Sequence, residues 1–223
     1  IDIGIDRNAF LHLNDVMQSF GRKGDKDIDI HKLIKVGQEI DVQVVKEAIM
    51  PKGAKVTTNI SLPGRYLVLM PNNNTIAVSR RIEQEEERER LKKIVHKIKK
   101  NEYGFIIRTA ATGKEEEDLL PDMDFLVRLW NKIQKRGKRA KAPLLLHEDL
   151  SLTYRVIRDL FTEEIDEFLV NSKQEYEDII NYLDNLFLLE LKPRVSYYDG
   201  DKPIFDAFNI EKEISKALEK KIW

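Results

Sequence analysis

Cysteine is absent from this sequence, and histidine occurs only four times. Without cysteine the chain has neither disulfides nor thiolate-bound metal sites, and no secretory context is implied. The histidines, His12, His31, His96 and His147, show no metal-ligand spacing such as H-x-x-x-H. His96 falls within a predicted helix, where a surface or partly packed side chain is the commoner role. The sequence therefore predicts no metal site.

The motifs of several common enzyme classes are also missing. The sequence contains no G-x-S-x-G, no P-loop and no G-x-G-x-x-G. Acidic pairs are frequent, but most lie on predicted helix faces with lysines nearby, which is typical of a solvated surface. We therefore predict no catalytic constellation within this chain.

Long apolar runs and an excess of one charge are absent too. The longest apolar run is far shorter than the ~18 residues of a membrane-spanning helix, and no signal peptide is recognisable. The 38 Lys and Arg nearly cancel the 39 Asp and Glu, which argues against a uniformly basic nucleic-acid-binding protein but allows local basic patches. We predict a soluble cytoplasmic protein without a membrane span.

Alternating apolar and polar residues predict β structure over the first 60 or so residues. In IDIGIDRNAFLHL a strand is expected from Ile1, with a turn at Gly4 and with Phe10 and Leu11 beyond the turn. Further strands are expected at Ile40, Val42 and Val44, and over residues 56–60. Short strands joined by polar, glycine-bearing loops are typical of a small antiparallel barrel or sandwich.

The remainder of the sequence mixes strands and helices. Up to about residue 153, strands are expected over residues 66–70, 103–108 and 143–146, the last of them buried. A highly charged helix is expected over residues 82–100, and another from Leu119 to beyond Ile133, ending near Gly137. Beyond residue 153 we expect helix 155–161, strand 165–170, helix 174–186, strand 195–198 and a last amphipathic helix, 210–222.

The segment GFIIRTAATGK, residues 104–114, has a pattern typical of a phosphate-binding site. Arg108 and Thr109 follow a predicted buried strand, and the small Ala110 and Ala111 leave room for a ligand to approach the backbone. Arginine can bond two phosphate oxygens at once, and threonine adds a hydroxyl donor. An arginine that only forms an ion pair at a strand end is the alternative, which spacing alone favours.

Two basic clusters and two residues of the β region are further candidates. The pair Arg80 and Arg81 and the run over residues 132–141 offer phosphate contacts, whose affinity depends on salt and not on sequence. The run can instead complement the helix dipole and stay solvated, and both interpretations remain open. Phe10 can stack on a base and Lys52 can reach a nucleic-acid backbone, although a phenylalanine in NAFLHL is more simply a core residue.

Six motifs in order resemble the ribonuclease E/G family of bacterial endoribonucleases: DIGIDRNAFLHLND, GAKVTTNISLPGRYLVLMPNN, SRRIE, GFIIRTAATGK, APLLLHED and RDLF. The resemblance spans almost the whole chain and implies an α+β fold in three parts. Residues 1–57 would be an N-terminally truncated OB-type β-barrel that binds RNA. Residues 58–153 would be an α+β 5′-sensor domain, and residues 154–223 part of an RNase H-like α/β subdomain.

The same resemblance implies the residues of a pocket for the 5′-monophosphate of single-stranded RNA. Arg108 and Thr109 would hold the phosphate. Gly64 and Val68 would shape the pocket floor and meet the first nucleotide, and Arg81 would support the pocket.

In the OB-type part, Phe10 and Lys52 match positions that the family uses on single-stranded RNA. The asparagines at 72–74 have no assigned role beyond turn formation.

The resemblance places the cutting machinery outside this sequence. The family's magnesium-binding carboxylates would follow Trp223, and its zinc-binding cysteine pair and oligomer contacts lie in further missing parts. Because both ends look cut, we expect a piece of a longer enzyme of RNA processing and mRNA decay, which binds RNA but does not cleave it. A stand-alone RNA-binding module, and an assembly role for the charged helix 82–100, remain alternatives.

Overall fold

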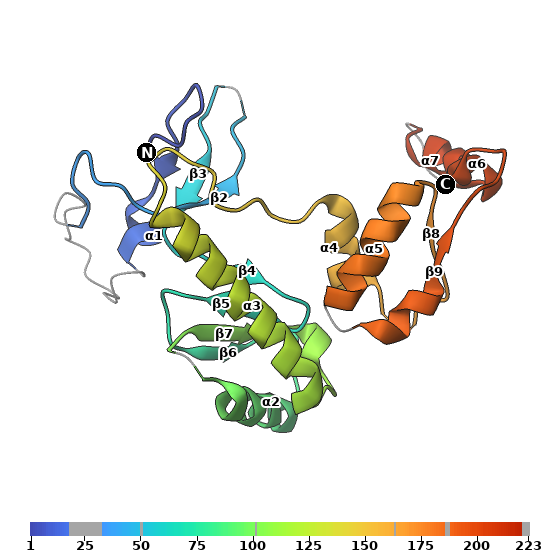
Figure 1. Cartoon of the computed structure of the whole chain (residues 1–223), viewed down its shortest axis with the longest axis horizontal. Helices are drawn as coiled ribbons and strands as arrows, with labels where there is room; N and C mark the ends of the chain where they lie inside the picture. Colours follow the sequence, from blue (N-terminus) through green and yellow to red (C-terminus); the bar gives the residue numbers. More distant parts are fainter. Residues whose placement is uncertain (18–32, 50, 101, 163, 186–187, 220–223) are drawn as a thin grey trace. The chain divides into compact units, whose positions relative to one another are not determined.

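The computed structural model describes residues 1–17, 33–49, 51–100, 102–162, 164–185 and 188–219. The chain divides into two compact units, Ile1–Leu150 and Ser151–Trp223, which are described separately (Figure 1). Both units mix helices with small sheets, so the expected α+β class is confirmed.

The first unit opens with a three-stranded sheet in the order β1-β3-β2. Strand β1 (Phe10–Leu11) runs parallel to β3 (Lys55–Thr57), and β2 (Gln43–Lys46) runs antiparallel to β3. Helix α1 (Leu13–Met17) follows β1. Within the described residues these strands form an open sheet and no closed barrel, so the OB-type assignment of this part stays a prediction.

The strand expected at the start of IDIGIDRNAFLHL is wrong, whereas the turn expected at Gly4 is confirmed. Only Phe10 and Leu11 are extended and paired. Residues 2–8 instead form a loop that two hydrogen bonds between Ile1 and Ala9 close. The Ile1 amino group donates to the Ala9 carbonyl oxygen, and the Ala9 N–H donates to the Ile1 carbonyl oxygen, each at 2.8 Å. Gly4 lies in this loop at φ +81°, a backbone angle that side-chain-bearing residues rarely adopt and that ends an extended run.

A four-stranded sheet in the order β4-β5-β7-β6 forms the centre of the first unit. Its strands are β4 (Leu62–Pro63), β5 (Leu67–Met70), β6 (Ile76–Val78) and β7 (Gly104–Ile107). Only the β6–β7 pair is parallel. Because strand side chains alternate between faces, Leu67 and Leu69 of β5 and Phe105 and Ile107 of β7 turn to one side, where all four are fully buried.

Two helices supply the rest of this core: α2 (Glu85–Ile98) packs against β6, and α3 (Glu116–Gly137) packs against β4 and β5. Their buried residues recur at spacings of three and four, as predicted from the sequence. They are Leu91, Val95 and Ile98 of α2 and Leu119, Asp122, Met123, Leu126, Trp130 and Ile133 of α3. All but one are apolar, and the exception, Asp122, belongs to the candidate site.

The buried strand expected over residues 143–146 is also wrong. No strand forms there, and Leu144 and Leu145 are 51% and 64% exposed. Only Leu146 packs partly against the core. A short apolar run becomes a strand only where a neighbouring strand pairs with it, and none among the described residues pairs with this segment.

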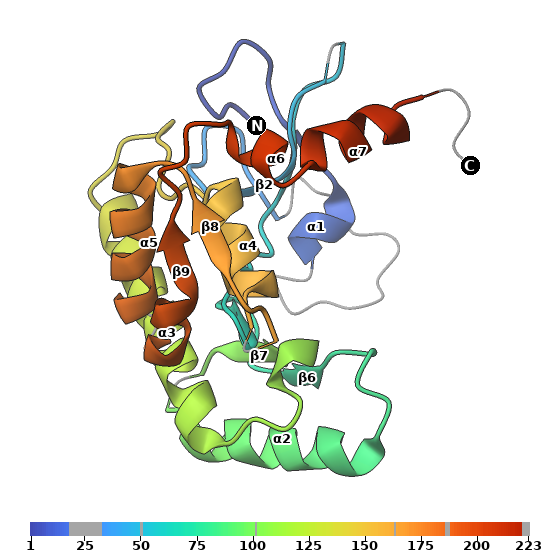
Figure 2. The same cartoon turned by 90° about the vertical axis from the view of Figure 1, so that its right-hand side faces the viewer.

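The second unit packs helices against a parallel pair of strands, β8 (Phe168–Val170) and β9 (Val195–Tyr197). Its longer helices are α4 (Leu152–Leu160), α5 (Lys173–Asn185) and α7 (Ile210–Ala217), and α6 (Ile204–Ala207) is a single turn. A 3₁₀ segment, Leu189–Arg194, leads into β9. Figure 2 shows α5 lying along the strand pair, and Ile157, Phe161, Ile179, Leu183 and Leu191 are fully buried between these elements.

The last helix ends before the predicted position. Helix α7 stops at Ala217, and residues 220–222 of the expected helix lie outside the described residues. No helix in the described parts of the chain combines the length and the apolar character needed to cross a membrane.

Candidate functional site

Arg108 joins the end of β7 to the turn between β4 and β5. Its backbone N–H donates to the Tyr66 carbonyl oxygen at 2.8 Å, and its Nη1 donates to the Gly64 carbonyl oxygen at 2.5 Å. The residue is half-buried, so part of it is accessible to solvent. One residue thus connects two segments that lie 44 positions apart in the sequence.

A buried carboxylate of α3 fixes the turn that carries Gly64. Asp122 is 6% exposed and accepts backbone N–H groups from Arg65, Tyr66 and Leu67 at 3.0, 2.9 and 2.9 Å. A Cβ atom on Gly64 would lie 2.5 Å from Asp122 Oδ1. Glycine is therefore needed here for the carboxylate to approach the turn.

The electrostatics of Asp122 combine opposing effects. Burial raises the pKa of this carboxyl above its usual value, because the charged form loses its hydration. The three backbone N–H groups and the nearby positive charge of Arg108 act in the opposite direction. Asp122 therefore lies beneath the turn as a hydrogen-bond acceptor that also interacts electrostatically with Arg108.

Thr109 and Arg81 meet through Ser79, which follows β6. The Thr109 and Ser79 hydroxyl oxygens lie 3.2 Å apart, and the Arg81 backbone N–H donates to Ser79 Oγ at 3.3 Å. Thr109 begins a 3₁₀ turn, Thr109–Ala111, immediately after Arg108. The Arg81 and Thr109 side chains are both exposed, and Ser79 links the Arg81 backbone to the Thr109 hydroxyl at the ends of β6 and β7.

Two further side chains hold these loops in place. Arg88 of α2 donates through Nη1 to the carbonyl oxygens of Ser79 and Ile82 at 2.8 and 3.0 Å. Glu87 accepts Arg90 Nε and Nη2 at 2.7 and 2.9 Å, and it also accepts the Gly113 backbone N–H at 2.8 Å. This bonding lowers the pKa of Glu87 to about 2, with the hydrogen bond from Arg90 as the largest cause.

Val68 lies in the middle of β5, paired with Ile106 of β7. Because Leu67 and Leu69 point into the core, Val68 points to the opposite face of the sheet, where it is half-buried. The structure therefore brings Gly64, Val68, Arg108, Thr109 and Arg81 to neighbouring strands and turns of one sheet. Their role in binding stays a prediction.

Phe10 and Lys52 lie in the N-terminal sheet region. Phe10 is 61% exposed on β1, so its simplest sequence interpretation, a core residue, is wrong. Its ring lies edge-on to His12, with centroids 6.2 Å apart. Lys52 is exposed and pairs through its backbone with Ile49 in a tight turn. An exposed ring and an exposed cation remain compatible with the predicted contact to single-stranded RNA.

Sequence reasoning missed Asp122, Ser79 and Glu87. Asp122 left a recognisable signal, because it is the one acid among the buried positions of α3. Ser79 stands in the motif SRRIE, but its partner Thr109 lies far away in the sequence. Glu87 left no signal, because it lies on a helix face crowded with charges.

In the described parts of the chain, no three His, Cys, Asp or Glu side chains lie close enough together to hold a metal ion.

The model of the Ribonuclease E/G family matches residues 61–223. Ribonuclease G of Salmonella typhimurium (strain SL1344) is 42% identical over 228 residues, and ribonuclease G of Haemophilus influenzae is 39% identical; each match covers 100% of this chain and 46% of the relative. Ribonuclease E of Escherichia coli (strain K12) is 33% identical over 232 residues, with 21% of its length covered. The chain thus spans about half the length of the ribonuclease G relatives. The extent of these matches shows that the chain belongs to the ribonuclease E/G family.

Proposed function

We propose that this chain is the RNA-binding, 5′-end-sensing part of an endoribonuclease specific for single-stranded RNA. The observation that carries the proposal is that Arg108, Thr109 and the Gly64 turn meet at one end of the paired inner strands β5 and β7, in a member of this family. A terminal monophosphate would be recognised there by its charge and its oxygens.

Arg108 would provide the main contact with the phosphate. Its guanidinium stays protonated in proteins and forms charge-assisted hydrogen bonds to phosphate oxygens. The bond to the Gly64 carbonyl oxygen orients the guanidinium before RNA arrives. Less conformational freedom is then lost on binding, which favours affinity.

Thr109 and Arg81 would complete the pocket. The Thr109 hydroxyl can donate to a phosphate oxygen, and the exposed Arg81 adds positive charge beside it. Gly64 and Val68 would form the floor below the first nucleotide. A triphosphate would be excluded by size and charge, and a 5′-hydroxyl would lack the bonding oxygens.

The N-terminal sheet would bind the RNA away from its 5′ end. Exposed Phe10 can stack on an unpaired base, and Lys52 can contact the backbone. The longer protein would cleave RNA in the cytoplasm with the help of Mg²⁺. It would also bind a structural Zn²⁺ and form homo-oligomers, and the residues for all of these lie outside this chain. RNA processing and mRNA decay would be its role.

The test compares RNA oligonucleotides that differ only in a 5′-monophosphate or a 5′-hydroxyl. Arg108→Ala should weaken binding of the monophosphorylated RNA by roughly tenfold or more, because a hydrogen bond to a charged group is worth about 1.5–3 kcal/mol. Binding of the hydroxyl RNA should change little. Arg155→Ala, which removes an exposed arginine from α4, is the matched control. An equal loss on both RNAs in Arg108→Ala would overturn the proposal.

A further inference from the structure

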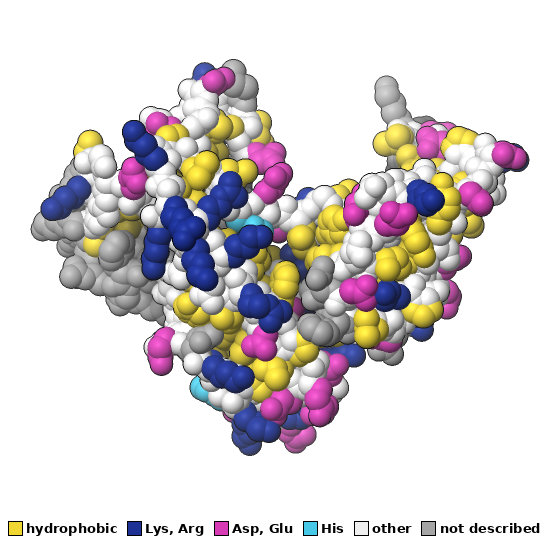
Figure 3. Space-filling view, viewed as in Figure 1, with side chains coloured by type: hydrophobic (Ala, Val, Ile, Leu, Met, Phe, Trp, Pro, Cys, Tyr) yellow, Lys and Arg dark blue, Asp and Glu magenta, His cyan; other side chains and the backbone are white. Residues whose placement is uncertain are grey.

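A row of basic side chains, here called the α3 stripe, follows the C-terminal half of α3 and the turn just beyond its end: Arg128, Lys132 and Lys135 on the helix, and Arg139 two residues after it. The spacings of four and three residues align Arg128, Lys132 and Lys135 along one face of the helix, and Arg139 lines the same cavity as Lys135. All four are exposed, while Trp130 and Ile133 on the opposite face are buried. Figure 3 shows dark-blue side chains gathered over this part of α3.

The α3 stripe is not neutralised by acids. The sequence has no Asp or Glu between Asp124 and Glu148. Among the residues that the structure describes, no member of the stripe forms an ion pair. Asp41 approaches the helix end near Gly137, but it pairs with none of the four.

Helix α2 shows the opposite arrangement of charge in the same unit. Its Arg90 pairs with Glu87 at 2.7 Å, and its Lys92 pairs with Glu89 at 2.5 Å. Lys97 pairs with Glu116 of α3 at 2.5 Å. The charges of α2 are thus largely neutralised within the protein, whereas the stripe presents positive charge to solvent.

The helix dipole does not account for the stripe. A cation gains from the dipole only within the last turn of a helix. Helix α3 ends at Gly137, so Arg128 and Lys132 lie before its last turn. Their alignment with Lys135 and Arg139 needs another explanation.

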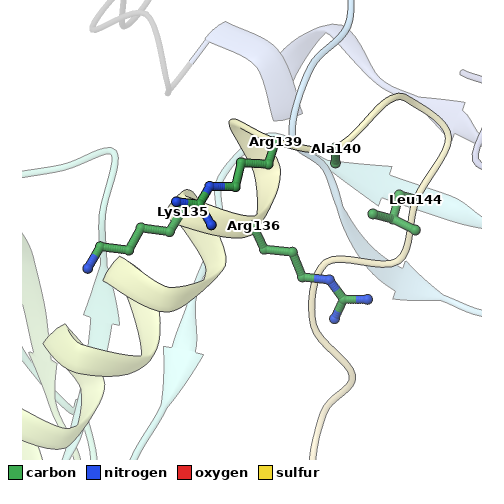
Figure 4. A pocket seen from close by; sticks show the side chains of 5 residues that line it. All are labelled: Lys135, Arg136, Arg139, Ala140 and Leu144. Atoms are coloured by element: carbon green, nitrogen blue, oxygen red, sulfur yellow. The ribbon is translucent and has the colours of Figure 1, made fainter.

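An open cavity of about 410 Å³ lies at the end of the stripe, lined by Lys135, Arg136, Arg139, Ala140 and Leu144 (Figure 4). Lys135 and Arg139 extend to the same side of the helix end, and Arg136 extends to the other. Arg136 has a structural partner, because its Nη1 donates to the Leu146 carbonyl oxygen at 3.1 Å. The cavity therefore combines two cations without ion pairs in the described chain and an apolar wall.

We propose that the α3 stripe binds the phosphate backbone of RNA, at a site separate from the pocket for the 5′ phosphate. The proposal rests on the proposed function in taking RNA as the ligand. Seven residues at 1.5 Å each place Arg128 and Lys135 about 10 Å apart along the helix, and Arg139 continues the row beyond the helix end, so the stripe can follow consecutive phosphates. Such contacts add affinity that depends on salt and not on base sequence or on the 5′ group.

The test is the double variant Lys135→Gln/Arg139→Gln in the full chain. Its matched control, Lys92→Gln/Lys97→Gln, removes two positive charges from α2. Binding of 5′-monophosphate and 5′-hydroxyl single-stranded RNA is measured across a salt series, and circular dichroism checks the fold. The stripe variant should lose about tenfold in affinity for both RNAs. The slope of log Kd against log salt should fall by about 1.4, since each single-strand phosphate contact contributes about 0.7.

The outcomes separate this proposal from the 5′-sensor proposal. The proposal that the stripe binds RNA would be overturned if the slope of log Kd against log salt stayed unchanged in the stripe variant. An equal change of this slope in the control variant would also overturn it. If the stripe variant bound RNA as well as the wild type but bound anionic lipid vesicles less well, the ligand of the stripe would be a membrane surface and not RNA. If the wild-type chain shows no 5′-monophosphate preference while the stripe variant still loses slope, the sensor proposal fails and the stripe stands.

Discussion

Helices α2 and α3 carry similar numbers of charges but use them in different ways. On α2 the acids and bases mostly pair with each other at the surface, as Glu89 does with Lys92. On α3 the buried acid, Asp122, bonds to backbone N–H groups of a distant turn, and the basic stripe faces solvent without acidic partners. The position of a charge relative to the core and to opposite charges therefore decides its role.

The largest effect is expected from removing the buried acid of α3. Asp122→Ala leaves the backbone N–H groups of Arg65, Tyr66 and Leu67 without their acceptor. Each unsatisfied buried donor costs about 1–3 kcal/mol, so unfolding free energy should fall by about 3 kcal/mol or more. Chemical denaturation measures this change, and the preference for 5′-monophosphate RNA should fall with it.

The control for Asp122→Ala is Glu89→Ala, which removes an exposed acid of α2. Exposed ion pairs contribute about 0–1 kcal/mol, so its stability should stay nearly that of the wild type. Similar losses in the two variants would contradict the contrast between buried and surface acids.

A smaller effect is expected where Asp122 meets the β4–β5 turn. Gly64→Ala places a Cβ atom 2.5 Å from Asp122 Oδ1, and overpacking of this kind costs about 1–3 kcal/mol. The displaced turn should also move the carbonyl oxygen that orients Arg108. Thermal melting and the binding ratio of the two RNA ends measure both consequences.

Gly137→Ala is the matched control at the other end of α3, where the nearest atom to a new Cβ is a Leu146 methyl carbon at 3.4 Å. Alanine is favoured over glycine in helices, so this variant should be neutral or slightly more stable. A stable Gly64→Ala protein with an unchanged preference for monophosphate RNA would show that the turn tolerates the added atom.

The smallest effect is expected from the acids of α2, and it should depend on pH. The folded-state pKa of Glu87 is about 2, below its usual value of 4.5. A lowered pKa means that the charged form stabilises the fold above the unfolded-state pKa and that this stability is lost as pH falls from about 4.5 towards 2. Glu87→Gln should therefore cost about 1 kcal/mol at pH 7, as expected of a partly exposed pair.

Urea denaturation of the wild type and of Glu87→Gln at pH 7 and pH 3 measures this dependence. The difference between the two proteins should shrink at the lower pH. A difference that stays constant would mean that the side chain acts through packing and not through its charge.

Periodic segments of the sequence were predicted well, because their pattern reflects burial on one face. The strand residues of β5 and β7 and the apolar stripes of α2 and α3 lie where predicted. The short apolar run over residues 143–146 and the alternating residues at the start of the sequence were not predicted correctly. The 143–146 segment found no strand to pair with, and the first residues fold back to Ala9 instead of extending.

The candidate site was predicted in part. The resemblance supplied Arg108, Thr109 and Gly64, and the structure places them on adjoining elements. The residues that hold these segments in place, above all Asp122, were not predicted. From the sequence alone, an acidic residue in a helix is predicted to lie at the surface. Only the structure shows whether it is buried and which groups it bonds.

The sequence by itself determined the family, the α+β class and the helix faces that are buried, since each depends on local pattern or on motifs in order. Only the tertiary structure decided which charges have partners. Asp122 bonds to N–H groups 55 to 57 positions away, whereas the α3 stripe lies along a helix without an acid opposite it. Hydrogen bonds and ion pairs act over a few ångströms in space, and separation along the chain does not report that distance.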